Sequence, residues 1–236
     1  MNIALIIAGG SGERMNQDIP KQFLNVNDKP VIIYTLQAFQ NHPNIDKIEV
    51  VCLDGWQEIL RAYCKQFGIT KLDNIVEGGK NGQDSIRNGL WDIKERYSGD
   101  SLVLIHDAIR PMVSEEIISD AIRVCKKYGN AISVIPCAEA MLKTENGLSS
   151  NVQIPRDNLK RTQTPQTFLL KDIVDAHVEA LEKGITNSVA SCTMYIELGR
   201  ELYFSAGSEK NIKLTTPDDI DIFKSLLITK KAEWMK

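Results

Sequence analysis

A glycine-rich turn and two cations follow the first apolar segment of the chain. Segment 3–8 reads Ile-Ala-Leu-Ile-Ile-Ala, which is typical of a buried strand. The glycines of the turn that follows are Gly9, Gly10 and Gly12. Glycine lets the backbone turn sharply and approach a ligand, and successive N–H groups in such a turn bind anions. Because Arg14 and Lys21 add two positive charges a few residues later, we expect a polyphosphate site rather than a turn without a ligand.

Two familiar phosphate-binding motifs do not fit this turn. A P-loop ends in Gly-Lys-Ser/Thr, which is absent. The dinucleotide fingerprint has a third glycine and opens a helix directly, but here Met15 stands at that position and Pro20 soon follows. An NAD-dependent oxidoreductase would need an acidic residue after the second strand, and Asp54 comes about 40 residues after the loop, about twice the usual spacing. That class stays open as an alternative.

Composition and charge fit a single cytoplasmic domain, residues 1–236. The chain has a formal net charge of −3 and 43% hydrophobic residues, so it can bury a core and has no marked charge that would favour nucleic acid or a membrane surface. No apolar stretch has the length of a membrane span, and the N-terminus lacks a signal-peptide pattern. The five cysteines form no Cys-x-x-Cys pair and the three histidines lie far apart, so we expect neither a zinc site nor a disulfide framework.

Apolar runs alternate with amphipathic segments along most of the chain. The expected strands are 3–8, 47–53, 73–76, 102–105, 131–135 and 201–205. The expected helices are 31–41, 57–67, one opened by Asp84, one capped by Ser114, 170–182, 189–198, and a last one from Asp218 or Asp219 to about 227. This alternation predicts an α/β fold with a mostly parallel sheet flanked by helices. Ligands bind beyond the carboxyl ends of such strands, so the loops after 3–8, 73–76 and 102–105 should meet at one edge.

The alternation stops between about residues 136 and 166. This stretch has turn residues at 145–147 and no strong helical period. We interpret residues 137–166 as a protruding β-arm made of short strands. Such an arm can bury itself by returning to its own body or by packing on another subunit, and the alternative is a mobile loop.

Six motifs, in order along the chain, together resemble the CTP-dependent cytidylyltransferases of polyol phosphates. They are Ala-Gly-Gly-Ser-Gly-Glu-Arg-Met at 8–15, Pro-Lys-Gln at 20–22, Gly-Gly at 78–79 with Asp-Ser at 84–85, His-Asp-Ala-Ile-Arg-Pro at 106–111, Gln-Thr-Pro-Gln at 163–166 and Asn-Ile-Lys at 211–213. The resemblance implies a Rossmann-like nucleotidyltransferase fold and a homodimer that exchanges its arm. It implies that a polyol phosphate attacks the α-phosphorus of CTP and releases pyrophosphate, with Mg²⁺ bridging the triphosphate.

The resemblance also implies roles for individual residues. The catalytic cations would be Arg14, Lys21 and Lys213. CTP would be bound by Ala8, Gly9, Gly10, Gly12, Gly79 and Ser85. The acceptor would be bound by Asp107, Arg110, Arg156 and Thr164, with Asp107 also beside the metal. These types suit the reaction, because the acceptor phosphate is already a nucleophile and catalysis needs mainly positioning and charge neutralisation. His106 is expected to pack behind the site rather than act as an acid or base.

Two stretches depart from the family pattern. Lys80 and Gly82 stand where the methylerythritol enzymes usually have an acidic residue and an arginine. Near Val189 and Ala190 the family usually has a Thr-Asp pair, which is absent here unless Thr186 and Asn187 take its place through a local shift. This altered pocket favours D-ribitol 5-phosphate or a related linear polyol phosphate as acceptor. The alternatives are 2-C-methyl-D-erythritol 4-phosphate, the oxidoreductase class above, and a relative that binds CTP without turnover.

Overall fold

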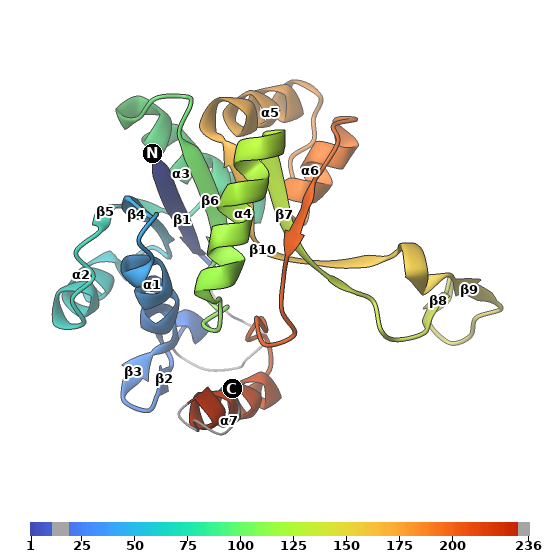
Figure 1. The fold of residues 1–236 in the computed structure, drawn as a ribbon, viewed down its shortest axis with the longest axis horizontal. Coiled ribbons are helices and arrows are strands. Elements are labelled where there is room, and N and C mark those ends of the chain that lie inside the picture. Colours follow the sequence, from blue (N-terminus) through green and yellow to red (C-terminus); the bar gives the residue numbers. More distant parts are fainter. Residues whose placement is uncertain (11–18, 231–236) are drawn as a thin grey trace.

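The computed structural model describes residues 1–10 and 19–230, and its centre is a seven-stranded sheet (Figure 1). The strands are β1 (Asn2–Ala8), β4 (Lys47–Cys52), β5 (Leu72–Glu77), β6 (Leu102–Asp107), β7 (Asn130–Pro136), β10 (Lys160–Leu169) and β11 (Phe204–Ala206). Their order across the sheet is β11-β7-β10-β6-β1-β4-β5. Strand β10 runs antiparallel to its neighbours β6 and β7, and the other pairs are parallel. The predicted α/β fold with a mostly parallel sheet is confirmed.

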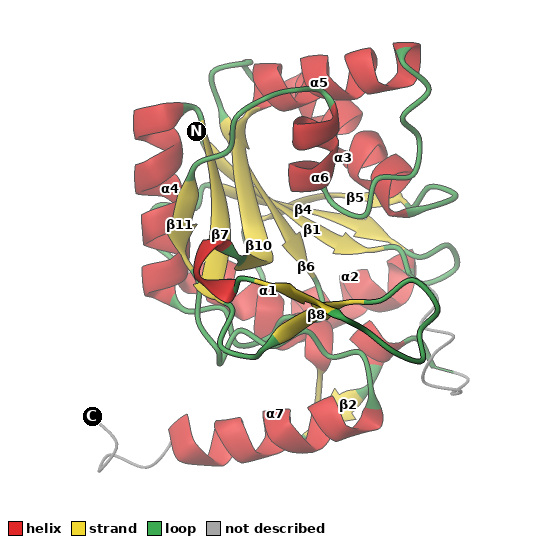
Figure 2. Cartoon of the chain, turned by 90° about the vertical axis from the view of Figure 1, so that its right-hand side faces the viewer, coloured by secondary structure: helices red, strands yellow, loops and turns green. Residues whose placement is uncertain are grey.

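Helices cover both faces of this sheet (Figure 2). One face is covered by α1 (Val31–Asn41), α2 (Gln57–Gln66) and α4 (Glu115–Tyr128), and the other by α3 (Gly82–Arg96), α5 (Leu170–Glu182) and α6 (Ser191–Glu197). Successive side chains of a strand point to opposite faces of the sheet, so one strand contributes to the apolar cores on both faces. In β1, Ala4 and Ile6 belong to the first core, and Ile3 and Leu5 belong to the second. None of the described helices is long and apolar enough to cross a bilayer.

Most helix ends lie within a few residues of the positions that the sequence predicts. Ser114 caps α4 by accepting a hydrogen bond from the N–H of Ile117, as predicted. Helix α3 begins at Gly82 rather than at Asp84, because the side chain of Asn81 accepts a hydrogen bond from the Asp84 N–H at 2.9 Å and is the true N-cap. Strand β11 and helix α6 begin later than predicted, and α7 (Pro217–Lys230) extends further in both directions.

The arm leaves the sheet after β7 and carries a small hairpin, β8 (Met141–Lys143) with β9 (Val152–Ile154) (Figure 1). Residues 160–166, which were predicted to belong to the arm, lie instead in β10, where Thr162 pairs with Val134 of β7. Their polar composition hid the strand, because buried side chains such as Gln163 and Gln166 meet polar partners rather than an apolar core. The protruding part of the chain is therefore shorter than 137–166.

Helix α7 packs against the short hairpin of β2 (Asn25–Val26) and β3 (Lys29–Pro30) and holds the preceding loop. Phe223 of α7 is fully buried in a separate apolar cluster and meets the ring of Tyr34 edge-on at 5.1 Å. Leu214 belongs to the same cluster, and its N–H donates to the carbonyl of Ile109 at 2.9 Å. The loop before α7, which includes Lys213, is thereby fixed to the end of β6.

Helix α3 is anchored to the sheet at two places. A Cβ on Gly89 would lie 2.5 Å from a methyl carbon of Leu5 and 2.8 Å from one of Val51, so the helix approaches β1 and β4 too closely for any larger residue. At the end of the helix, Arg96 forms ion pairs with Asp73 and Asp92, and its guanidinium also donates a hydrogen bond to the buried carboxyl of Glu49. These anchors fix the helix whose first turn carries the second glycine loop.

Glu49 within this cluster is 1% exposed. Burial raises the pKa of its carboxyl to about 9, and nearby Asp92 adds to the shift while Arg96 opposes it. Because the pKa in the folded state is above the unfolded value of about 4.3, the folded protein holds this proton more tightly. The stabilisation that this proton contributes is present below the unfolded pKa and is lost as pH rises toward about 9.

We therefore expect Glu49→Gln, which cannot ionise, to lose less stability than the wild type on going from mildly acidic pH to about 9. Urea unfolding at a series of pH values measures this difference in the free energy of unfolding. Glu58→Gln, at an exposed position on α2, is the control and should follow the wild type. Parallel curves for wild type and Glu49→Gln would contradict the assignment.

Candidate active site

A cavity of about 400 Å³ opens where the carboxyl ends of β1, β5 and β6 meet. Its lining includes Ala8–Gly10, Lys21, Gln22, Gly79–Gly82, Ser85, Asp107–Ile109 and Lys213. The loops that the sequence placed at one edge of the sheet are thus brought together, along with two of the three predicted cations. Arg14 and Gly12 lie outside the described residues.

Ser85 joins the two glycine loops. Its hydroxyl accepts a hydrogen bond from the Gly79 N–H at 3.0 Å and donates to the carbonyl of Asn81 at 2.9 Å. A Cβ on Gly9 would lie 3.1 Å from this hydroxyl and 3.3 Å from the Cα of Gly78, so glycine permits the close approach of the two loops. The contact of Ser85 with cytosine stays a prediction.

Gln22 fixes the first glycine loop, a role that was not predicted from the sequence. Its side chain is buried, and its Nε2 donates to the carbonyls of Ala8 and Gly10, both at 2.9 Å. It follows Lys21 in a short 3-10 turn, Lys21–Phe23. The signal that could have identified Gln22 is its place in the Pro-Lys-Gln motif beside a polyphosphate loop.

A second cavity of about 320 Å³ adjoins the first and shares Asp107 and Lys213 with it. Its wall includes the predicted acceptor residues Arg110 and Thr164. The rest of the wall includes Ile86, Ile105, His106, Gln163, Gln166 and residues 189–191. Two chambers that meet at a charged pair suit a reaction in which one molecule attacks another.

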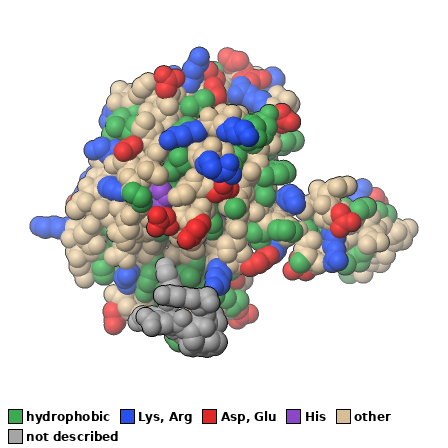
Figure 3. Space-filling model, in the orientation of Figure 1, with side chains coloured by type: hydrophobic (Ala, Val, Ile, Leu, Met, Phe, Trp, Pro, Cys, Tyr) green, Lys and Arg blue, Asp and Glu red, His purple; other side chains and the backbone are tan. Residues whose placement is uncertain are grey.

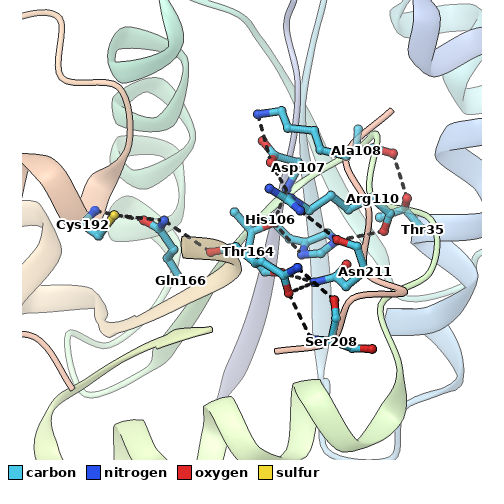
Figure 4. A network of polar contacts seen from close by, with 12 residues as sticks. Thr35, His106, Asp107, Ala108, Arg110, Thr164, Gln166, Cys192, Ser208 and Asn211 are labelled. Carbon is cyan, nitrogen blue, oxygen red and sulfur yellow. Dashed lines mark hydrogen bonds and ion pairs between the residues drawn. The ribbon is translucent and has the colours of Figure 1, made fainter. Parts of the chain in front are cut away.

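Asp107 lies between two cations at this junction (Figure 4). Its Oδ2 is 3.0 Å from Arg110 Nε and 3.1 Å from Lys213 Nζ. Burial alone would raise the pKa of the Asp107 carboxyl, but Lys213 and Arg110 outweigh burial and hold the pKa below its ordinary value. The carboxylate is therefore ionised, and it holds both cations at the place where the cavities meet.

His106 is completely buried, as expected of a residue that packs behind the site. Burial lowers the pKa of its imidazole to about 4, so the ring is neutral near pH 7. Its Nδ1 lies 3.0 Å from the hydroxyl of Thr164, and its Nε2 lies 3.2 Å from the carbonyl of Arg110. Its ring also meets Phe39 of α1 at 5.1 Å.

Asn211 is a second buried residue for which no role of its own was predicted, although it belongs to the Asn-Ile-Lys motif. Its Nδ2 donates to the carbonyl of Thr164 at 2.8 Å and to Oε1 of Gln163 at 3.2 Å. The backbone carbonyl of Asn211 accepts a hydrogen bond from Arg110 Nη1 at 2.8 Å. Asn211 therefore attaches the loop of Lys213 to β10 and to the end of β6.

Arg156 is the predicted site residue that stays apart from the others. It begins a 3-10 turn on the arm, Arg156–Asn158, and its Nη1 donates to the carbonyl of Ala138 in the same arm. In the described part of the chain it lines neither of the two cavities. A contact between Arg156 and the acceptor would have to come from another subunit.

Asp107 is the one carboxylate that the described residues contribute to either cavity. The described residues contain no group of three His, Cys, Asp or Glu side chains that could hold a metal. Mg²⁺ commonly uses one or two carboxylates together with substrate phosphates and water. One carboxylate at this place therefore fits a Mg²⁺ ion that is held jointly with a triphosphate.

Comparison with known proteins agrees with this arrangement. The family described as 2-C-methyl-D-erythritol 4-phosphate cytidylyltransferase (IspD) matches residues 2–229. A ribitol-5-phosphate cytidylyltransferase of Lacticaseibacillus paracasei is 43% identical over 98% of this chain and 100% of its own length. A 2-C-methyl-D-erythritol 4-phosphate cytidylyltransferase of Clostridium botulinum is 39% identical over 96% of this chain and 97% of its own.

Solved structures show the same fold. The crystal structure of the 2-C-methyl-D-erythritol 4-phosphate cytidylyltransferase from Thermus thermophilus superposes with a TM-score of 0.76 at 25% identity, covering 95% of this chain and 98% of that one. Both the sequence and the fold therefore match along almost the whole chain. From the two glycine loops, the charged junction and these matches together, we conclude that the chain belongs to the IspD family and is a CTP-dependent cytidylyltransferase.

Proposed function

We propose that the enzyme transfers CMP from CTP to D-ribitol 5-phosphate, forming CDP-ribitol and pyrophosphate. The observation that carries the proposal is the pair of cavities that meet at Asp107 and Lys213. The first cavity, with its glycine loops and Lys21, suits a nucleotide triphosphate. The second, whose mixed wall includes Arg110, Thr164 and several other polar side chains, suits a hydroxylated phosphate ester.

The chemistry at the junction needs charge neutralisation more than proton transfer. An oxygen of the acceptor phosphate forms a bond to the α-phosphorus of CTP, and the bond from that phosphorus to the bridging oxygen of pyrophosphate breaks. The nucleophile is already ionised, so the difficulty is repulsion between two anions. Lys213 lines both cavities and can face oxygens of either reactant, and Lys21 adds a second charge on the nucleotide side.

We also propose that Mg²⁺ binds at this junction. Asp107 and the phosphate oxygens of CTP would hold it, in keeping with the single carboxylate that the described residues place in the two cavities. When bound, the ion would neutralise charge on the triphosphate.

The wall of the second cavity supports D-ribitol 5-phosphate as the acceptor. Val189 and Ala190 line it. They lie near the place where the family usually has a Thr-Asp pair. Without that acidic side chain, the wall loses one fixed polar contact and one negative charge. Gln163, Gln166 and Thr162 remain as polar groups along the β10 side. This wall suits an unbranched polyol chain, and a relative named for that acceptor matches at 43% identity, against 39% for one named for the alternative acceptor.

Measuring pyrophosphate release from CTP with a panel of polyol phosphates tests the acceptor. We expect the largest kcat/KM with D-ribitol 5-phosphate, and loss of turnover when a chelator removes divalent metal. A higher kcat/KM with 2-C-methyl-D-erythritol 4-phosphate would replace ribitol by the alternative acceptor. Absence of turnover with every acceptor would leave a protein that binds CTP without catalysis.

Replacing Lys213 tests where the positive charge acts. Lys213→Ala should lower kcat by about 100-fold while the Kd for CTP changes little, because the charge matters most when negative charge builds up at phosphorus. Lys21→Ala should behave in the same way. Lys210→Ala removes an exposed lysine from the same loop and should leave kcat unchanged. An equal loss in CTP binding and in kcat would mean that Lys213 serves binding alone.

We further propose a homodimer in which the arm of one subunit reaches the other. The arm stands away from the body, with hydrophobic side chains on its surface (Figure 3). Leu142 is 62% and Leu148 92% exposed. Exposed apolar side chains on a protruding hairpin favour a protein partner, and a second copy would bring Arg156 to a site that its own chain does not reach.

Mixing two inactive variants tests this exchange. Arg156→Ala and Lys213→Ala should each lose turnover, and equal mixing with subunit exchange should restore about a quarter of the wild-type rate, because half the dimers then contain one intact site of two. The molar mass in solution should be that of two chains. Mixtures that stay as inactive as their components would exclude sharing of the site.

A further inference from the structure

Strand β10 leaves its regular pairing at the point where it passes the active site. Its register with β7 shifts between Thr162 and Gln166. Residues 163–165 therefore contribute polar groups that the ladder does not use. Thr164 is the residue of this bulge that contacts both the end of β6 and the loop of Lys213.

The hydroxyl of Thr164 is held in one orientation by its neighbours (Figure 4). The carbonyl of Arg110 can only accept, so the Nε2 of His106 carries the proton in their 3.2 Å contact. The Thr164 hydroxyl has one proton, and of the two groups that it contacts only the Nδ1 of His106 can accept it, at 3.0 Å. The oxygen of that hydroxyl accepts a hydrogen bond from the backbone N–H of Asp107 at 3.1 Å.

The backbone of Thr164 holds the other half of the junction. Its carbonyl accepts a hydrogen bond from Asn211 Nδ2 at 2.8 Å, and Asn211 lies two residues before Lys213. Thr164 is therefore bonded to both chain segments whose charged side chains meet, Asp107 on β6 and Lys213 on the last loop. A shift of either segment would change the position of Lys213 relative to the reacting phosphates.

We propose that Thr164 is a positioning residue of the transfer reaction and that His106, in its Nε2–H tautomer, sets the direction of the Thr164 hydroxyl. The role differs from the contact with the acceptor that the sequence implied, because here the hydroxyl acts through Asp107. The inference rests on cytidylyl transfer and not on which polyol phosphate is the acceptor. It assigns His106 no proton transfer to substrate.

Thr167 offers a matched control on the same strand. It is fully buried, like its partners in the sheet, but its hydroxyl has no hydrogen-bond partner among the described residues and it lines neither cavity. Thr167→Val and Thr164→Val thus remove the same atom from the same strand. Only the second removes the link to Asp107 and His106.

Steady-state kinetics with CTP and the acceptor that the wild type uses would test the role. We expect Thr164→Val to lower kcat by about 10- to 100-fold with little change in the KM of the acceptor or the Kd of CTP, since small displacements of charged groups cost rate. Thr164→Ser keeps the hydroxyl and should recover most of the kcat. Thr167→Val should match the wild type. A loss confined to the acceptor KM would overturn the proposal in favour of direct contact, and an unchanged kcat would overturn it outright.

Two substitutions of His106 separate its two bonds and decide the matter if Thr164→Val does not fold. His106→Asn can keep an acceptor at the place of Nδ1, and His106→Gln can keep a donor at the place of Nε2. We expect Asn to retain more kcat than Gln. Equal loss, or the reverse order, would contradict a role through Thr164.

Nitrogen NMR gives a readout that needs no acceptor, so failure of the acceptor assignment and failure of this proposal remain distinguishable. The chain has three histidines, and each ring can be assigned from one substitution. His106 should show a protonated Nε2 and a hydrogen-bonded, unprotonated Nδ1. Thr164→Val should move the Nδ1 resonance and Thr167→Val should not. A proton on Nδ1 in the wild type would refute the assigned direction of the bond.

Discussion

Repulsion between two phosphorylated reactants is the constraint on which the arrangement of this site depends. The nucleotide and the acceptor are both anions, and their approach concentrates negative charge at one phosphorus. The protein places Lys213 where its two cavities meet, and Asp107 holds both Lys213 and Arg110 at that place. An ion pair that fixes a cation before substrates arrive reduces the reorganisation that the reaction would otherwise need.

The sheet supplies this junction because an antiparallel strand enters it. Strand β10 lies between β6 and β7, and its bulge puts polar groups beside the carboxyl end of β6. In a purely parallel sheet that place would be occupied by a buried, mainly apolar strand. The polar network around Thr164, His106 and Asn211 is mostly buried, so its hydrogen bonds are strong and leave few alternative arrangements.

Elements far from the cavities determine how accurately the loops are placed. The close approach at Gly89 and the ion pairs of Arg96 fix α3, whose first turn carries Ser85 and the second glycine loop. On the other side, the apolar cluster around Phe223 fixes the loop of Lys213 through Leu214. The raised pKa of Glu49 in this cluster predicts that such an anchor also makes the stability of the fold depend on pH.

The sequence alone determined the features that depend on local pattern. The continuous apolar runs of β1 and β6, the helical period of α1 and α5 and the cap at Ser114 all follow from neighbouring residues. Only the tertiary structure decided that the polar run of β10 is a strand, that Asn81 caps α3 and that His106, Thr164 and Asn211 hold Asp107 and Lys213 together. Those bonds join residues far apart in the chain, and they depend on a register shift that no local period specifies. For the same reason Arg156 could be recognised from its motif but not placed, because a single chain does not bring it to the site.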